Sequence, residues 1–225
     1  IYNAGGAITH TAVSTLAGDI YQNDGTFVGG NVSLALAGSL DIENGTFTAP
    51  SAAFSLTGDF VHNGGTFAHN DGTVVFNGDG AQSISGANTF FNLTLANSSE
   101  SDKVDASGST LVVANLLRVQ DGTFLSASDY HDVQIDAGAV LELSGDITVS
   151  GNWTNHGTLV HNDHAVTLDG GNQFIAGSTT FYDLTKNVSS AATSSGRCRV
   201  NAKDSPSGNS TGNVSSTLAK PRVRP

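Results

Sequence analysis

Apolar and polar residues alternate along many short segments of this chain. Residues 32–36, 36–42 and 140–143 alternate apolar residues with small or polar ones. This period of two is typical of β-strands with one buried face, and the segments end at Gly, Asn or Asp, which favour turns. No stretch of helical length carries a convincing apolar stripe with 3.6-residue spacing. We therefore expect an all-β chain.

The alternation recurs near the start of the chain with an exact period of 20 residues. The recurring positions are Leu16, Leu36 and Leu56, and the triplet Gly-Thr-Phe at 25–27, 45–47 and 65–67. A strict period in this range indicates one structural unit stacked on copies of itself. A hairpin meander would bring identical positions into register only on every second strand, so the units are expected to run in parallel.

The period thus predicts a single-stranded parallel β-helix, or β-solenoid, with about nine coils of about 20 residues. We expect right-handed winding, because these coils are longer than those of left-handed hexapeptide helices. Turn residues precede each Thr-Phe pair and are expected to form corners with positive φ. The phenylalanines that follow are expected to stack about 4.8 Å apart in one internal column. They are Phe27, Phe47, Phe67 and Phe124.

A longer repeat overlays the first. Residues 58–95 return at 151–186, with an offset that drifts from 93 to 91. For example, Gln-Ser-Ile-Ser-Gly at 82–86 returns as Gln-Phe-Ile-Ala-Gly at 173–177. This predicts a duplicated block of several coils within one repeat domain of residues 1–190. Between the copies, residues 97–108 are rich in Asn, Ser and Asp, which predicts a loop bulging from the solenoid.

The repeated sequence motifs stop after Lys186. Residues 191–225 hold no aromatic residue and three of the four prolines. This composition predicts a disordered basic tail, with a fragment boundary or a reading-frame error as the open alternative. At the other end the chain begins mid-pattern at Ile1, so we expect it to be a piece of a longer parent chain.

Charge is distributed unevenly between these two parts. Residues 1–190 hold 19 acidic and three basic residues, a net charge of −16, whereas residues 191–225 carry +5. An acidic body repels nucleic acid and anionic membrane surfaces, so we expect no nucleic-acid partner. No run of 18 apolar residues is present, and no membrane insertion of this segment is expected. Cys198 is the only cysteine, which excludes an intramolecular disulfide and leaves its role open.

Two clusters have ligand-like residues, at 69–71 (His-Asn-Asp) and 161–164 (His-Asn-Asp-His). In a strand, His161 and His164 point to opposite faces, so both could bind one metal ion only if a turn intervened. We interpret both clusters as solvated turns. The segment 77–80 (Asn-Gly-Asp-Gly) occurs once and lacks the repeated spacing of calcium-binding β-rolls. No metal or cofactor is expected.

Two further patterns raise alternative functions. Asp19, Asp41 and Asp59 fall near one another in the 20-residue register, where carboxylates could share general acid and base roles in polysaccharide cleavage. None of the three basic residues of the body lies in those coils, so an acidic substrate would lack a partner. The outward column of threonines at 26, 46 and 66 raises ice binding, but residues 28, 48 and 68 are Val, Thr and Ala. We predict no catalytic residue and no enzyme; a polysaccharide lyase or hydrolase, and an ice- or calcium-binding solenoid, stay open as alternatives.

The motifs of residues 58–94, Gly-Asp-Phe, Asn-Gly-Gly-Thr-Phe, Ala-Gln-Ser-Ile-Ser-Gly and Thr-Phe-Phe-Asn-Leu-Thr, resemble the β-strand repeats of large bacterial surface and secreted proteins. Over roughly residues 15–190 the chain is similar to the parallel β-helix shafts of filamentous-haemagglutinin-type and autotransporter adhesins. The resemblance implies export and a place at the cell surface. We expect a structural stalk or adhesin-like module whose polar exterior offers a broad, weak binding surface to glycans or proteins. It supplies no catalytic residues, and the tail departs from it.

Overall fold

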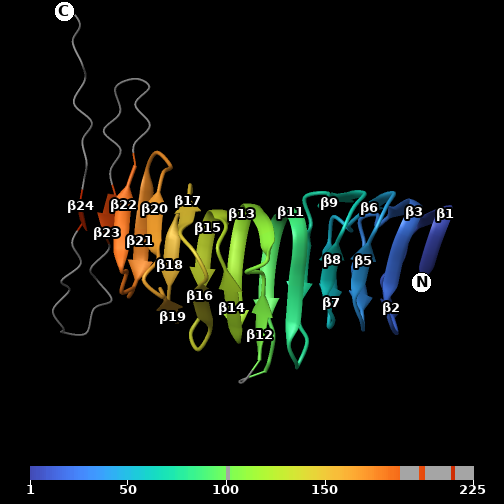
Figure 1. The fold of residues 1–225 in the computed structure, drawn as a ribbon, viewed down its shortest axis with the longest axis horizontal. Helices are drawn as coiled ribbons and strands as arrows, with labels where there is room; N and C mark the ends of the chain where they lie inside the picture. Colours follow the sequence, from blue (N-terminus) through green and yellow to red (C-terminus); the bar gives the residue numbers. More distant parts are fainter. Residues whose placement is uncertain (100–101, 188–197, 201–213, 216–225) are drawn as a thin grey trace, which may run out of the picture.

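The computed structural model describes residues 1–99, 102–187, 198–200 and 214–215, the last two ranges as backbone only. The described residues form an all-β parallel solenoid of about nine coils, with roughly 20 residues per coil. Figure 1 shows the coils stacked along the long axis, from β1 at one end to β22 near the other. The predicted fold class is therefore confirmed. The handedness stays a prediction.

Each coil passes through three faces, which we number in the order in which the chain visits them. Face 1 contains β2 (Ser14–Leu16), β4 (Leu34–Leu36), β7 (Ala53–Leu56), β10 (Thr73–Phe76), β18 (Trp153–Asn155), β21 (Gln173–Gly177) and β23 (Cys198–Val200). Face 2 contains β5 (Leu40–Ile42), β8 (Phe60–His62), β12 (Lys103–Asp105), β14 (Thr123–Ser126), β16 (Val140–Leu143) and β19 (Thr158–Val160).

Face 3 contains β6 (Thr46–Thr48), β9 (Thr66–Ala68), β17 (Ile147–Val149), β20 (Ala165–Leu168), β22 (Asp183–Lys186) and β24 (Val214–Ser215). Longer strands turn a corner and contribute to more than one face. β1 (Tyr2–Thr9) and β3 (Ile20–Val28) join faces 2 and 3, β13 (Ser109–Asp121) and β15 (Asp129–Ile135) join faces 3 and 1, and β11 (Gln82–Ala96) crosses all three.

The apolar half of each alternating strand points inward and stacks on its equivalents in the neighbouring coils. On face 3, Phe27 and Phe47 are parallel, with ring centroids 4.5 Å apart and planes inclined by 6°. Phe67 continues this column 6.3 Å from Phe47, and its ring contacts Phe90 of β11 edge-on at 5.4 Å. Full burial of one such side chain contributes roughly 1.5–3 kcal/mol. The core runs through the coils and includes Leu34, Phe54, Phe60, Val74, Leu93, Leu117, Leu141, Val149 and Leu168.

Phe124 does not belong to the phenylalanine column, so that part of the prediction is wrong. It lies on face 2, where Val104 and Leu141 are its strand partners. The cause is unequal coil length. The coil from Phe60 to its partner Ile84 spans 24 residues, whereas the coil from Phe124 to Leu141 spans 17. Residues added at or removed from a corner shift the later sequence relative to the 20-residue period, so the Gly-Thr-Phe motif at 122–124 lies on a different face from the earlier ones.

The loop predicted over residues 97–108 is also partly wrong. Within it, β12 pairs with β11 and β14, and Val104 and Ala106 are fully buried. Asn97 is buried as well, and its side-chain amide donates to Gln82 Oε1 at 3.0 Å and to the Gly80 carbonyl at 2.7 Å. The predicted loop is therefore wrong at Asn97 and over residues 103–106, which belong to the solenoid.

The two copies of the duplicated block occupy different faces. Phe60 lies on face 2, but its equivalent Trp153 lies on face 1. Likewise Gln82 opens β11 on face 2, and Gln173 opens β21 on face 1. The spacing of 93 residues between Phe60 and Trp153 is not a whole number of coils of roughly 20 residues. The second copy is therefore displaced by one face around the axis.

A buried glutamine makes equivalent corner contacts in the two copies. Gln82 donates to the carbonyls of Leu56 at 3.2 Å and Gly58 at 2.8 Å, and its Oε1 accepts from the Gly78 amide at 3.0 Å. Gln173 donates to the carbonyls of Val149 and Gly151 in the same way. These bonds satisfy backbone groups that the corner takes out of the strand ladder.

The tail predicted over residues 191–225 falls mostly outside the described residues. Its described parts, β23 and β24, pair in parallel with β21 and β22. The domain boundary at residue 190 and the disorder of the tail stay predictions.

Candidate functional site

Both histidine-containing clusters form tight turns, as predicted. Asn70 and Asp71 have positive φ of 50° and 53°, and the equivalent Asn162 and Asp163 have 47° and 62°. In each turn the histidine Nδ1 accepts a hydrogen bond from the backbone N–H of the aspartate, at 3.0 Å. The imidazole of the first copy stacks on Phe91 with centroids 5.8 Å apart, and that of the second lies 5.6 Å from Tyr182.

The second cluster does not bring its histidines to one point. His161 faces Asp163 and Tyr182, whereas His164 Nδ1 lies 3.7 Å from Asp146 Oδ1. Among the described residues, no group of three or more His, Cys, Asp and Glu side chains is placed to hold a metal ion. Cys198 belongs to β23, for which the structure gives the backbone only.

The segment at 77–80 is a corner built around Gln82. The Gly78 amide donates to the Gln82 side chain, and the Gly80 carbonyl accepts from Asn97. Asp79 is exposed. The polar residues of this segment thus serve the turn, in keeping with the absence of the repeated β-roll spacing from the sequence.

Asp19, Asp41 and Asp59 do not converge into a catalytic pair. Asp19 Oδ1 accepts from the Ser39 backbone at 2.8 Å, and Ser39 Oγ in turn accepts from the Asp59 backbone at 2.9 Å. Asp59 Oδ1 accepts from Ser83 in the next coil at 2.7 Å. Aspartate and serine therefore alternate along one corner, each capping a backbone amide of the neighbouring coil.

Asp41 lies apart from this corner, on the outer side of β5 between Tyr21 and Val61. Partial burial raises its pKa, and the charge of Glu43 raises the pKa further. Its Oδ1 is buried and has no hydrogen-bond partner. Burial first, and the carboxylates of Glu43 and Asp41 next, also raise the pKa of Tyr21. These groups repel one another and include no basic partner.

The threonine column is formed as predicted. Thr46 pairs in register with Thr26 and Thr66 on face 3. Two positions later the same strands carry Val28, Thr48 and Ala68, so no second threonine column lies beside the first.

The three basic residues of the body are all engaged. Lys103 Nζ lies 2.7 Å from Glu142 Oε2, and Arg118 binds Asp136 through Nε and its terminal nitrogen, at 2.8 and 2.7 Å. The hydrogen bond from Lys103 is the main cause that lowers the pKa of Glu142. Lys186 is buried, and its Nζ donates to Gln173 Oε1 at 2.5 Å. Each basic residue is thus bound within the solenoid.

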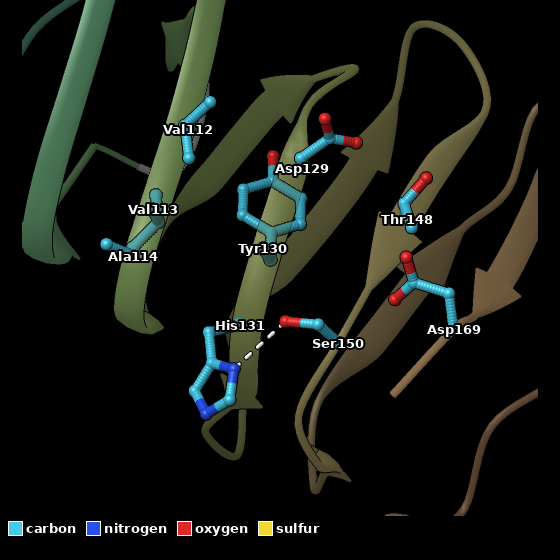
Figure 2. A pocket seen from close by; sticks show the side chains of 9 residues that line it. All are labelled: Val112, Val113, Ala114, Asp129, Tyr130, His131, Thr148, Ser150 and Asp169. Atoms are coloured by element: carbon cyan, nitrogen blue, oxygen red, sulfur yellow. Dashed lines mark hydrogen bonds between the residues drawn. The ribbon is translucent and has the colours of Figure 1, made fainter. Parts of the chain in front are cut away.

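A hollow of about 340 Å³ lies on face 3 (Figure 2). It lies across β13, β15 and β17 and reaches the residue that follows β20. One outward row consists of Val112, Asp129 and Thr148, which are successive strand partners. Figure 2 shows Thr148 and Asp169 at one border and His131 with Ser150 at another.

Below the hollow, Tyr130 is fully buried. Its hydroxyl donates to Ser126 Oγ at 2.8 Å, and Ser126 and Ser128 bond to each other at 2.9 Å. Burial raises the pKa of Tyr130 to about 12, although the hydrogen bonds to the two serines oppose the shift. The neutral phenol fixes the floor of the hollow and does not offer its hydroxyl to a ligand.

His131 and Ser150 form a pair at the rim, with Nδ1 and Oγ 2.9 Å apart. A serine beside an imidazole is the first half of a nucleophilic arrangement, which also needs a third group to orient the base. In the described part of the chain, no hydrogen bond or ion pair holds the other ring nitrogen of His131. The pair is therefore better suited to binding, since each partner orients the other.

Sequence reasoning missed this hollow. Its polar residues sit in three different coils, at spacings of 17 to 40 positions, and they share no motif. The usable signal was the outward position of Asp129, His131, Thr148 and Ser150 in alternating segments, which becomes a site only once the strand register is known.

Among the residues that the structure describes, none forms a helix long and apolar enough to cross a lipid bilayer. Comparison with protein-family models, with curated proteins and with solved structures finds no match to this chain.

Proposed function

We propose that this chain is a structural, adhesin-like segment of a secreted or cell-surface bacterial protein. The solenoid extends the parent molecule as a stalk and offers a weak binding surface to glycans or proteins. The sequence pattern of residues 15–190 supports this proposal by its similarity to the shafts of filamentous-haemagglutinin-type and autotransporter adhesins.

The observation that carries the proposal is the unbroken pairing along face 1. Parallel pairs link β2 to β4, β7, β10, β11, β13, β15, β18 and β21 without a gap. With about nine coils, and strands about 4.8 Å apart, the described body is about 40 Å long. Each coil is held only by its neighbours, so such a body can lengthen without a new core. This is what a spacer needs.

The outer surface supports a binding role of modest strength. Its polar side chains are mostly Asn, Ser, Thr and Asp. The Lys and Arg side chains within residues 1–187 are hydrogen-bonded to other side chains of the solenoid. A broad polar surface of this kind gives many weak hydrogen bonds rather than one buried hot spot.

The proposal is tested by applying the purified chain to a glycan array and measuring reducing-end release from the same glycans. We expect weak, reversible retention on some glycans and no release. Small-angle X-ray scattering on the same sample should give an elongated particle. Rapid release from any glycan, or a compact spherical particle, would contradict a stalk.

A further inference from the structure

The hollow on face 3 carries two carboxylates that the chain leaves unneutralised. Asp129 and Asp169 lie in its lining, and in the described part of the chain neither carboxylate has a hydrogen-bond or ion-pair partner. Asp136 and Glu142, by contrast, are bound to Arg118 and Lys103. Two open carboxylates in one concavity therefore mark a place that favours a cationic ligand.

The spacing of the carboxylates suits a ligand larger than a metal ion. Asp129 stands on β15, and Asp169 follows β20, which pairs with β17, the neighbour of β15. Asp129 is in register with Thr148 and Thr167, so Asp169 lies two strand spacings away, or about 10 Å, and two residues farther along the strand direction. A single cation at normal coordination distance would not be bound by both carboxylates through such a gap. A ligand of several bonded units can reach both.

The space between the carboxylates offers hydroxyl groups and apolar surface. Thr148 and Ser150 point outward there, and Ser150 is oriented by His131 at 2.9 Å. Val112, which is 37% exposed, and Ala114 form the opposite border. Hydroxyl groups and an aliphatic border match the hydroxyls and the C–H faces of a sugar ring. The volume of about 340 Å³ lies at the small end of ligand sites, which span about 300–1,000 Å³.

We propose that this hollow binds a sugar chain that bears free amino groups. The two ammonium groups would be bound by Asp129 and Asp169, and the ring hydroxyls between them by Thr148 and Ser150. Ammonium–carboxylate hydrogen bonds are about twice as strong as neutral ones, so the amino groups set the preference. This inference rests on the proposed function, because it names the glycan class for which the surface is selective.

The first test titrates the full chain, by heteronuclear NMR or calorimetry, with three tetrasaccharides. We expect the glucosamine tetramer to bind at least about tenfold more tightly than the N-acetylglucosamine tetramer, and the galacturonate tetramer not to bind. Added NaCl should weaken binding of the glucosamine tetramer, since the site is open to solvent. Shifted amide resonances should cluster at residues 112–114, 129–131, 148–150 and 169.

The second test uses matched charge variants. Asp129→Asn and Asp169→Asn should each weaken binding of the glucosamine tetramer about five- to tenfold, and Ser150→Ala about two- to threefold. Asp79→Asn removes the same charge from an exposed turn outside the hollow and should leave the affinity unchanged. Unfolding curves of all four variants show whether the fold is retained.

The outcomes separate this inference from the proposed function. Unchanged affinity in both aspartate variants would overturn the assignment to the hollow while leaving a glycan-binding stalk intact. Equal affinity for spermine would show that the hollow responds to charge alone and would overturn the sugar assignment. Release of reducing ends would contradict the stalk itself, and absence of binding to every amino sugar would overturn the inference.

Discussion

Gly45 lies directly over Gly25 in the corner between faces 2 and 3: a Cβ atom on Gly45 would stand 2.4 Å from the Gly25 carbonyl oxygen. The two residues have nearly the same positive φ, 73° and 71°. The corner thus excludes a side chain for two separate reasons, the left-handed backbone and the closeness of the next coil.

Replacing Gly45 by alanine should therefore destabilise the solenoid by about 2 kcal/mol or more, from backbone strain and overpacking together. The loss should be visible as a lower denaturant midpoint by circular dichroism. Gly108 has open space around it and no positive φ, so Gly108→Ala should change stability by less than about 0.5 kcal/mol. Equal effects of the two substitutions would show that the corner relaxes.

Gln82 is 2% exposed, and its side chain binds backbone groups of the preceding coil and of its own corner. Gln82→Leu keeps the volume but leaves those buried groups without partners, at about 1–3 kcal/mol each. We expect a total loss of about 3 kcal/mol or more in the free energy of unfolding. The exposed Gln120 is the control, and Gln120→Leu should be nearly neutral. A neutral Gln82→Leu variant would mean that water satisfies the corner.

Tyr130 makes stability depend on alkaline pH. Its folded-state pKa is about 12, above its ordinary value of 10.0, so its contribution is fully present below pH 10 and is lost as pH rises through 12. At neutral pH, Tyr130→Phe should cost about 1 kcal/mol through the lost bond to Ser126.

Between pH 10 and 12 the wild-type chain should lose about 2 kcal/mol that the phenylalanine variant does not lose. Urea unfolding of both proteins at pH 8, 10 and 11.5 measures the difference. A constant gap between the two proteins over this range would show that Tyr130 is not buried as a neutral phenol.

His69 and His161 occupy equivalent turns, each with a backbone hydrogen bond to Nδ1 and an aromatic neighbour. Alanine at either position should cost about 1 kcal/mol. Because the turns are far apart in the stack, the two losses should add in the double variant. His156, which is exposed and has no ring contact, serves as the control. Strong non-additivity would indicate coupling along the solenoid.

The local features were predictable from the sequence because they depend on neighbouring residues only. Glycines 25, 45, 65 and 122 all have positive φ, between 69° and 73°, as the Asn-Gly and Asp-Gly pattern indicated. The column of Leu16, Leu36 and Leu56 follows from the exact period. Identical spacing requires identical register, so these contacts needed no knowledge of the rest of the chain.

The features that the sequence did not predict correctly have positions that depend on the summed lengths of all the preceding coils. The position of Phe124 is set by every corner before it, and corner insertions leave no periodic signal. β12 was hidden because its single large buried side chain, Val104, stands among polar corner residues. The hollow could not be predicted from the sequence for the same reason, since Asp129 and Thr148 are neighbours only in the observed strand register.

The displacement of the duplicated block by one face has a consequence for recognition. Equivalent outward residues of the two copies face different sides of the solenoid and do not form one continuous strip. Examples are Phe91 and Tyr182, each with its neighbouring histidine. A short straight ligand that engages one copy cannot engage the other at the same time, so duplication brings no avidity for it. Only a ligand that winds around the rod, or two separate partners, would use both copies.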